Sequence, residues 1–221
     1  MRLASRSLLL NKLEPDLGSE IATLDREIVH AIESVVWPPG SADFAILAES
    51  GVKRGKGSGV GLIKKEFVDS VVDSGWIAER GLRFADGTVI GRFDAVKPLK
   101  GAEFNEGRGR TLNVHSGQFA VLEWETGNIS SSHRSLNRMA LGLLHGGILA
   151  GHLVLPTRKL YRYLTGRVGS LEELSPYFRI YRALNLPRGF LEVLAVEYDR
   201  TSSDPAAVPR IPKATDGRAR Q

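Results

Sequence analysis

The sequence predicts an α/β fold in which helices flank one mixed central sheet. Two observations lead to this prediction. Segments with apolar residues at helical spacing alternate with short β-prone runs, and Asp86-Gly87 separates two alternating stretches as a hairpin turn does. With 221 residues, 42% of them hydrophobic and 25% charged, the chain is long enough for a sizeable core. We expect one domain over residues 1–200 and an extended basic arm over residues 201–221.

Five segments have the apolar spacing of an amphipathic helix. In the first, Ile21 and Leu24 fall on one face, which we expect to pack inward. The third has Asn128 or Ser130 as its cap, because short polar side chains satisfy the first backbone N–H groups of a helix. Pro156 suits the first turn of the fourth. The expected helices cover residues 19–36, 64–78, 128–145, 156–164 and 171–184.

Five other segments have the composition of strands. Two of them are the arms of the Asp86-Gly87 hairpin, and a third, just before the third helix, is rich in Phe, Val, Leu and Trp. The expected strands cover residues 82–85, 88–96, 118–125, 149–155 and 190–197. The glycine-rich residues 51–61 are expected to form a loop.

Composition excludes several classes of protein. The chain has no cysteine, so disulfide scaffolds and thiolate zinc sites are excluded, and any metal must be bound by carboxylates, histidines or carbonyls. Carboxylates favour hard ions such as Mg²⁺. No run approaches the ~20 apolar residues of a membrane span, and the N-terminus lacks a signal-peptide core. We therefore expect a cytoplasmic protein that does not bind membranes.

Positive charge is concentrated in two segments of this chain, whose net charge is +5. Residues 51–65 carry five Lys or Arg and no acid, and residues 209–221 carry four against one acid. Such segments suggest a polyanion partner, because contacts with phosphates dominate the affinity of proteins for nucleic acid. The charges alone are also compatible with solvated loops.

Glu123 and Glu125 are two carboxylates in a β-prone apolar stretch. Residues two apart on a strand share one face, so these side chains are expected to project together. Two adjacent negative charges raise each other's pKa unless a cation neutralises them. On pattern alone, an exposed face of an edge strand is an equal alternative.

Asp94 favours a cation-binding site at the two glutamates over an exposed edge strand. It lies in the second arm of the predicted hairpin, which could pair with the glutamate strand and bring a third carboxylate to the same place. Such a cluster can bind Mg²⁺, activate a water molecule and stabilise charge on a reacting phosphate. Glu79 is a possible fourth acid, although a lone glutamate near a helix end is more often an ordinary surface charge.

Three blocks of sequence, WETGNISSSHRSLNRMALGLLHG, YLTGRVGSLEELSPYF and IPKATDGRAR, resemble the BamHI family of restriction endonucleases. The resemblance covers most of the chain from about Val36 to Arg220. It implies a Mg²⁺-dependent type II endonuclease with the α/β core of the PD-(D/E)xK nucleases. It also implies a homodimer that cuts each strand of a palindromic duplex once, in a restriction-modification system with a DNA methyltransferase.

The resemblance also assigns roles to the acids. Asp94 and Glu123 match the metal-binding acids, and Glu79 matches an additional acidic metal ligand. Glu125 stands where most of the wider superfamily has lysine, and in this family it is the proposed base that activates water. Residues 101–117 form a longer segment between Asp94 and Glu123 than the family has. A relative that binds DNA but has lost the chemistry is the alternative.

Each of the three blocks holds residues that could recognise bases. Asn128 can bond adenine and Arg134 guanine, each through two hydrogen bonds, and Ser130 can donate or accept, although the same residues suit a plain helix cap. The resemblance identifies these three as base contacts. It adds Arg167, which contacts the outermost guanine, and the Asp216-Gly217 pair of the C-terminal arm, which reaches the minor groove.

Gly166 is a departure from the family, which has aspartate immediately before the arginine. Glycine cannot accept the hydrogen bond from the outer cytosine, and one such contact contributes ~1–3 kcal/mol of discrimination. We therefore expect a GATC-centred palindrome, most simply GGATCC, with less strict recognition of the outer base pair.

Overall fold

A computed structural model describes residues 1–14, 17–51, 57–125, 127–165, 168–186 and 188–213. The strands are β1 (Arg2–Lys12), β2 (Ala45–Leu47), β3 (Ile77–Phe84), β4 (Val89–Pro98), β5 (Glu103–Glu106), β6 (Thr111–Ser116), β7 (Phe119–Trp124), β8 (Ile148–Pro156), β9 (Gly189–Glu197) and β10 (Arg200–Ser202). The α-helices are α1 (Gly18–Ser34), α2 (Gly61–Asp73), α3 (Ile129–His145), α4 (Arg158–Tyr161), α5 (Leu171–Leu174) and α6 (Phe178–Arg182). Two 3₁₀ turns are η2 (Ala48–Gly51) and η3 (Ser175–Tyr177).

One eight-stranded mixed sheet runs through the molecule in the order β1-β9-β8-β7-β4-β3-β6-β5. At its centre β8 is parallel to both β7 and β9, and every residue of β8 is buried. This is typical of parallel strands that are covered on both faces. Strand β4 is antiparallel to β7, and β3 is antiparallel to β4. β2 and β10 form a separate parallel pair.

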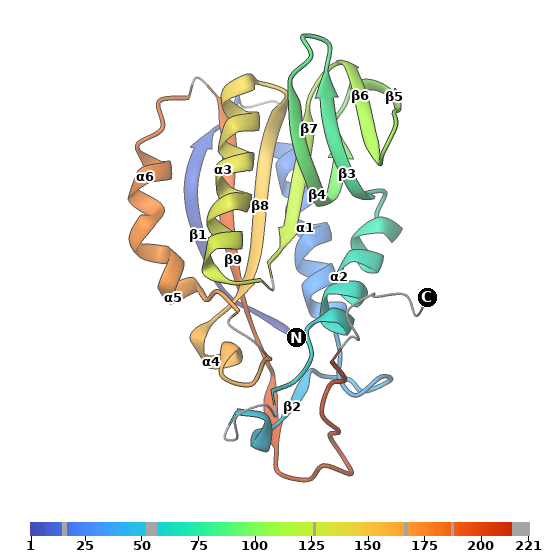
Figure 1. The fold of residues 1–221 in the computed structure, drawn as a ribbon, viewed down its shortest axis with the longest axis vertical. Helices are drawn as coiled ribbons and strands as arrows, with labels where there is room; N and C mark the ends of the chain where they lie inside the picture. The colour runs from blue at the N-terminus through green and yellow to red at the C-terminus, as the bar shows by residue number, and fades with distance from the viewer. Residues whose placement is uncertain (15–16, 52–56, 126, 166–167, 187, 214–221) are drawn as a thin grey trace.

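Helices cover both faces of the sheet (Figure 1). On one face, α1 and α2 pack against each other and against strand residues such as Leu122 and Leu194. On the other face α3 lies over β8 and buries Leu136, Met139 and Leu143. The predicted architecture, a mixed sheet between layers of helices, is confirmed.

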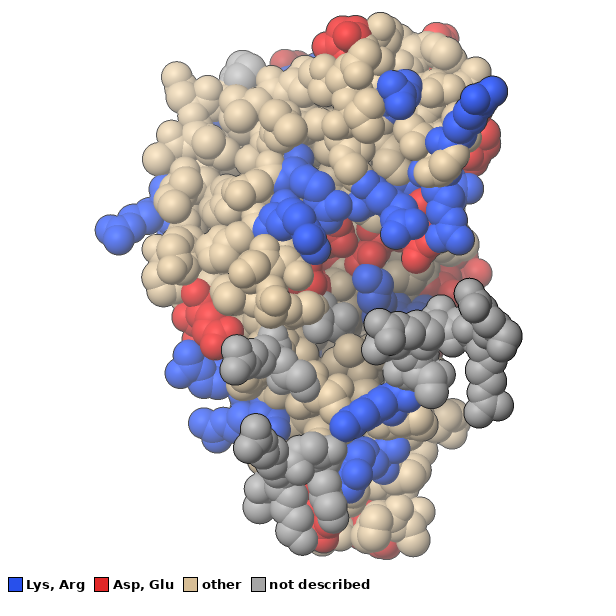
Figure 2. Space-filling model, in the orientation of Figure 1, with Lys and Arg blue, Asp and Glu red and all other residues tan. Residues whose placement is uncertain are grey.

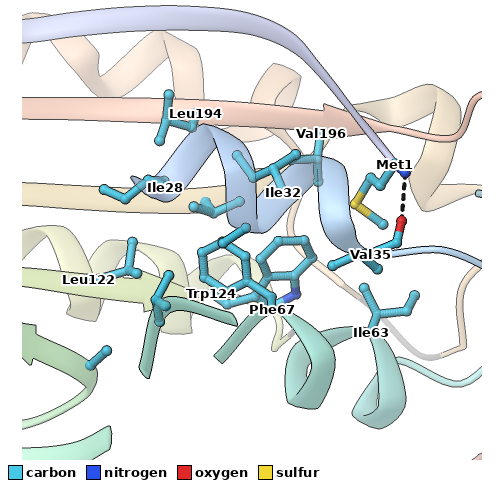
Figure 3. Packing of buried hydrophobic residues seen from close by; sticks show 14 of the residues in the cluster. Met1, Ile28, Ile32, Val35, Ile63, Phe67, Leu122, Trp124, Leu194 and Val196 are labelled. Atoms are coloured by element: carbon cyan, nitrogen blue, oxygen red, sulfur yellow. Dashed lines mark hydrogen bonds between the residues drawn. The ribbon is translucent and has the colours of Figure 1, made fainter. Parts of the chain in front are cut away.

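Aromatic packing ties α2 to β7. Phe67 of α2 is fully buried, and its ring centroid lies 4.5 Å from that of Trp124 at the end of β7 (Figure 3). Ile63 and Val71 lie on the same buried face of the helix. Because Glu123 and Glu125 flank Trp124 in the chain, this packing fixes α2 beside the glutamates.

Several predicted boundaries are confirmed. α1 and α3 lie within or almost within their predicted ranges, and Asn128 is the cap of α3, its Oδ1 accepting from Ser131 N at 3.2 Å. The Asp86-Gly87 hairpin joins β3 to β4, with Gly87 at φ 88° and Thr88 N donating to Asp86 Oδ1 at 2.9 Å.

Three helix predictions were wrong in extent. α2 ends at Asp73, because Gly75 adopts a left-handed φ of 88° and the chain then enters β3. Pro156 is the last residue of β8, and the short α4 begins after Thr157, whose hydroxyl accepts from Leu160 N at 3.3 Å. The helix predicted for residues 171–184 is divided into α5, η3 and α6, with Pro176 in the 3₁₀ turn.

Three strands of the main sheet were not predicted. β1 pairs antiparallel with β9 at one edge of the sheet. The long segment 101–117 contains β5 and β6, which extend the opposite edge beyond β3, and Phe104 packs on Phe119 with centroids 5.6 Å apart. This segment therefore enlarges the sheet and leaves the pairing of β4 with β7 in place.

Much of the described C-terminal segment packs against the body of the protein. β10 pairs with β2, Val208 and Ile211 are buried, and Trp37 Nε1 donates to Pro209 O at 2.7 Å. Residues 214–221, the end of the predicted arm, lie outside the described residues. Among the described helices, none is long and apolar enough to cross a membrane.

The contact between Phe67 and Trp124 leads to a stability prediction. Phe67→Ala should lower the free energy of unfolding by about 3–5 kcal/mol, because it leaves a cavity where α2 meets β7. Urea denaturation measures this loss. Leu144→Ala is the matched control, since Leu144 is 59% exposed on α3 and its truncation should cost no more than ~0.5 kcal/mol. A loss below about 1 kcal/mol for Phe67→Ala would contradict the structural role given to this contact.

Candidate active site

Asp94 and Glu123 lie next to each other on neighbouring strands. β4 pairs with β7 with Ala95 opposite Leu122, which places Asp94 beside Glu123 at the end of the paired region. Asp94 Oδ2 accepts from the backbone N–H of Trp124 at 2.9 Å, which fixes its carboxylate against the second strand. Trp124 itself points into the core on the side of α1 and α2. Two acids that are far apart in sequence are thus brought together by the sheet.

These two carboxylates line a cavity of about 230 Å³ that is rich in charged side chains. Its charged lining residues are Lys64, Glu79, Arg92, Asp94, Glu123, Glu125, Arg134 and Arg138. On the face of the molecule shown in Figure 2, acidic side chains lie in a hollow between groups of Lys and Arg side chains. The arrangement places negative groups at the bottom of a site whose rim is positive.

A cation contacts each member of the acidic pair. Lys64 Nζ, on α2, lies 2.6 Å from Asp94 Oδ1, and the Arg138 guanidinium, on α3, pairs with Glu123 Oε1. Because α2 and α3 cover opposite faces of the sheet, the pair lies where side chains from both helical layers meet. No sequence motif identifies Lys64 or Arg138 as part of the site. Arg138 could have been suspected only from its position one turn after Arg134.

Burial controls the charge of Glu123, whose exposed fraction is 6%. Loss of solvation and, second to it, the negative charge of Asp94 raise its pKa from 4.5 to about 8, although Arg138 and Lys64 act in the opposite direction. A carboxyl with this pKa favours either a proton or an additional cation nearby.

Arg138 is held by several contacts. Its guanidinium donates to the Arg92 carbonyl at 2.7 Å and to Ser135 Oγ at 3.3 Å, and it lies over the Phe93 ring at 5.2 Å from the centroid. Together with the ion pair to Glu123, these contacts fix the guanidinium between α3 and β4.

Glu125 follows the last residue of β7 and faces the same cavity as Glu123. Its Oε1 accepts from Gly127 N at 2.7 Å, and its Oε2 accepts from Ser135 Oγ at 3.2 Å. Its backbone N–H donates to Val154 O at 2.8 Å, which continues the pairing with β8. Glu125 therefore has a fixed orientation at the start of α3.

Glu79 lies at the edge of the site and faces two arginines. Its carboxylate pairs with Arg110 and lies 4.0 Å from Arg92, and its side chain is 48% exposed. Its φ of 50° is left-handed, which is uncommon for a residue with a side chain. Arg110 comes from the segment 101–117, so this segment reaches the rim of the cavity.

The carboxylates of the site are possible ligands of a metal ion. Within the described ranges, no group of three or more His, Asp and Glu side chains is arranged to hold a metal ion. The carboxylates that meet are Asp94 and Glu123, and their oxygens are the hard donors that Mg²⁺ prefers. The buried Glu123, with its raised pKa, next to the partly exposed Asp94 fits a divalent cation, which would replace the solvation that Glu123 has lost and neutralise the repulsion between the two carboxylates.

The N-terminal end of α3 presents polar side chains next to this cavity. Asn128, Ser130 and Arg134 are exposed, and the last two lie one turn apart on a shallow depression of about 450 Å³. His133, on the same depression, packs edge-on against Tyr177 with centroids 4.5 Å apart. The predicted contact residues Arg167, Asp216 and Gly217, and also Gly166, lie outside the described residues.

Comparison with known proteins shows a consistent likeness. A family model described as "Restriction endonuclease BamHI" matches residues 1–218. The chain is 42% identical over 193 residues to the type II restriction enzyme OkrAI of Oceanobacter kriegii, covering 87% of each chain. It is also 42% identical over 100 residues to the type II restriction enzyme BamHI of Bacillus amyloliquefaciens, covering 45% of this chain and 43% of that one.

The raised pKa of Glu123 leads to a pH prediction for the metal-free protein. Between pH 4.5 and about 8 the folded protein binds more protons at Glu123 than the unfolded chain does, so the free energy of unfolding falls as pH rises through this range. Glu123→Gln cannot titrate. The free energy of unfolding of the variant minus that of the unaltered protein should therefore be larger at pH 9 than at pH 5, by on the order of 2 kcal/mol.

Urea denaturation in the presence of a chelator measures this difference at each pH. Glu33→Gln is the control, because Glu33 is exposed on α1 and its substitution should leave the pH dependence unchanged. Parallel pH curves for the unaltered protein and Glu123→Gln would contradict the assignment of the raised pKa to Glu123.

Proposed function

The chain belongs to the BamHI family of restriction endonucleases, and on that premise we propose that it is a type II site-specific deoxyribonuclease that cuts both strands of a palindromic DNA duplex. The adjacent carboxylates of Asp94 and the buried Glu123, inside a cavity with a positively charged rim, are the observation that supports catalysis best. The exposed polar end of α3 beside that cavity supports sequence recognition. We assign the core to the PD-(D/E)xK nuclease type.

In this proposal Asp94 and Glu123 would hold Mg²⁺, and Glu79, which now pairs with Arg92 and Arg110, would be an additional ligand. Bound Mg²⁺ would supply Lewis-acid chemistry, lowering the pKa of water and offsetting charge on the phosphate. Asp94 is positioned for this role by the Trp124 N–H, and Glu123 by Arg138. The metal is inferred from the chemistry of the carboxylates and from the family.

Glu125 is the proposed base. Gly127 N and Ser135 Oγ hold its two oxygens, so the carboxylate is oriented before substrate binds. It would accept a proton from the water that attacks phosphorus. The bond from phosphorus to the 3′ oxygen then breaks, and the leaving oxygen takes a proton from solvent, which leaves a 5′-phosphate and a 3′-hydroxyl. The arginines of the rim would contact the phosphates on either side.

We propose that Asn128, Ser130 and Arg134 contact the inner base pairs in the major groove, and that Arg167 contacts the outermost guanine. The Asn128 cap uses one lone pair of Oδ1, so the amide retains the groups that adenine requires. Asp216 and Gly217 would contact the minor groove. These contacts give a GATC-centred site, most simply GGATCC, with relaxed discrimination at the outer pair because of Gly166.

A palindromic site has two identical halves, and two identical subunits address it naturally. We therefore propose a homodimer in which each subunit cuts one strand. A cytoplasmic enzyme of this kind requires a DNA methyltransferase that protects the host sites in a restriction-modification system.

A catalytically inactive DNA-binding relative is the second candidate. The ion pairs of Glu79 with Arg92 and Arg110 favour it, because this carboxylate already has two cationic partners in place of a metal ion. The intact pairing of β4 with β7 favours the enzyme, because the additional strands β5 and β6 do not separate Asp94 from Glu123. Nicking of plasmid DNA with Mg²⁺ but not with Ca²⁺ would distinguish the two.

Substitution of the acidic pair should separate cutting from binding. Asp94→Asn and Glu123→Gln should each lower the cleavage rate with Mg²⁺ by about 10³-fold or more, since each removes a charge that the transition state requires. Affinity for the cognate duplex in Ca²⁺ should remain within about threefold, measured by fluorescence anisotropy. Glu33→Gln is again the control and should cut normally. Retained cutting by Glu123→Gln would remove this residue from the mechanism.

Digestion of a randomised duplex library, followed by sequencing of the ends, tests the proposed site. The four central positions should read GATC, and discrimination at the outer pair should be about 10–100-fold weaker than at the inner pairs, as the loss of one ~1–3 kcal/mol contact predicts. Gly166→Asp should restore strict discrimination. Strict cutting at GGATCC by the unaltered protein would refute the relaxed outer pair and leave the nuclease proposal standing.

A further inference from the structure

Lys64 stands at a junction between two cavities. One is the site of about 230 Å³, and the other is a neighbouring cavity of about 290 Å³ between α2 and the start of β3. Lys64, Glu79 and Asp94 line both of them. The Lys64 side chain can therefore contact a ligand that binds beside Asp94, and it does so from the side of the site opposite to α3.

The backbone at Lys64 is rigid. It lies in the first turn of α2, and its N–H donates to Val60 O at 3.1 Å. Its neighbour Ile63 is buried, and Phe67 is fixed against Trp124 one turn later. Only the four-carbon side chain is therefore able to move, and it is anchored on an element tied to β7.

The ammonium of Lys64 is held much less firmly than the guanidinium of Arg138. Among the described residues its partner is Asp94, at 2.6 Å, and the side chain remains 36% exposed. An ammonium has three donor protons, and the ion pair with Asp94 Oδ1 can engage only part of this donor capacity. Arg138, in contrast, has partners on both α3 and β4. Arg138 thus resembles a structural clamp, and Lys64 has protons to offer to a substrate.

We propose that Lys64 is a catalytic residue of the hydrolysis, and that its ammonium donates to a non-bridging oxygen of the scissile phosphate beside Asp94. This inference rests on the proposed function. The non-bridging oxygens gain negative charge as water attacks phosphorus, so a fixed cation stabilises the transition state more than the ground state. The positive charge of Lys64 also offsets the negative charges of Asp94 and Glu123, which lowers the repulsion that an anionic substrate would meet beside them.

Single-turnover cleavage with Mg²⁺ tests the proposal with three variants. Lys64→Met should cut about 100-fold more slowly or worse, whereas its affinity for the cognate duplex in Ca²⁺ should stay within about threefold. Lys64→Arg, which keeps the charge on a different shape, should recover part of the rate. Lys65→Met is the matched control, because Lys65 is the next residue of the helix, is exposed and pairs with Asp69. It should cut within about twofold of the unaltered protein.

Phosphorothioate substrates supply a readout that a purely structural lysine would not change. With sulfur replacing one non-bridging oxygen at the scissile phosphate, the unaltered protein should prefer one of the two diastereomers. In Lys64→Met that preference should shrink about tenfold, since the contacting group is gone, and Lys64→Arg should retain it.

The outcomes separate this inference from the proposed function. Absence of cutting by the unaltered protein would overturn both. Normal cutting by Lys64→Met would overturn the role of Lys64 alone. So would a slow rate that returns to normal with more Mg²⁺ and an unchanged diastereomer preference, because Lys64 would then be only a counter-ion of Asp94.

Discussion

The antiparallel pairing of β4 with β7 is the constraint on which the site depends. It places Asp94 beside Glu123, and the N–H of Trp124 holds the Asp94 carboxylate in place. The same pairing also determines where Glu125 and the start of α3 lie, because Glu125 directly follows β7 and α3 begins four residues later. The positions of the acids relative to one another are therefore determined by backbone hydrogen bonds of a central strand pair, among the most rigid parts of a fold.

A buried carboxylate beside a second negative charge is unfavourable, and the surrounding residues show how Glu123 is stabilised next to Asp94. Arg138 and Lys64 lower the pKa of Glu123, yet burial and the charge of Asp94 keep it near 8. The metal-free site thus relies on two cations and a proton. In the proposed enzyme a divalent ion would take over this task, and the Lys64 ammonium, attached to a fixed helix, would be free to contact phosphate. The balance of charge is as much a part of the site as the acids.

Local patterns in the sequence predicted the elements that carry the acids. The Asp86-Gly87 turn, the apolar strand before Glu125 and the Asn128 cap each have a signal within a few residues, and each is present in the structure. Long-range contacts determine what was missed. β1 is stabilised by β9 from the other end of the chain, and Lys64 approaches Asp94 only because Phe67 packs on Trp124. No pattern near Lys64 contains that information, and the ion pair of Glu79 with Arg110 is equally non-local.

Helix α3 joins the two parts of the proposed function in one rigid element. Its first turns carry Asn128, Ser130 and Arg134 toward solvent, and its inner side carries Ser135 and Arg138 to the carboxylates of Glu125 and Glu123. Arg134 and Arg138 are one turn apart, so a shift of the helix that brings Arg134 to a base also moves the partner of Glu123. In the proposed enzyme, recognition of the correct bases and orientation of the acids are therefore coupled through the same backbone. A wrong base pair would weaken base recognition and misplace the acids at the same time. The sequence specificity of cleavage would therefore depend on the position of this one helix.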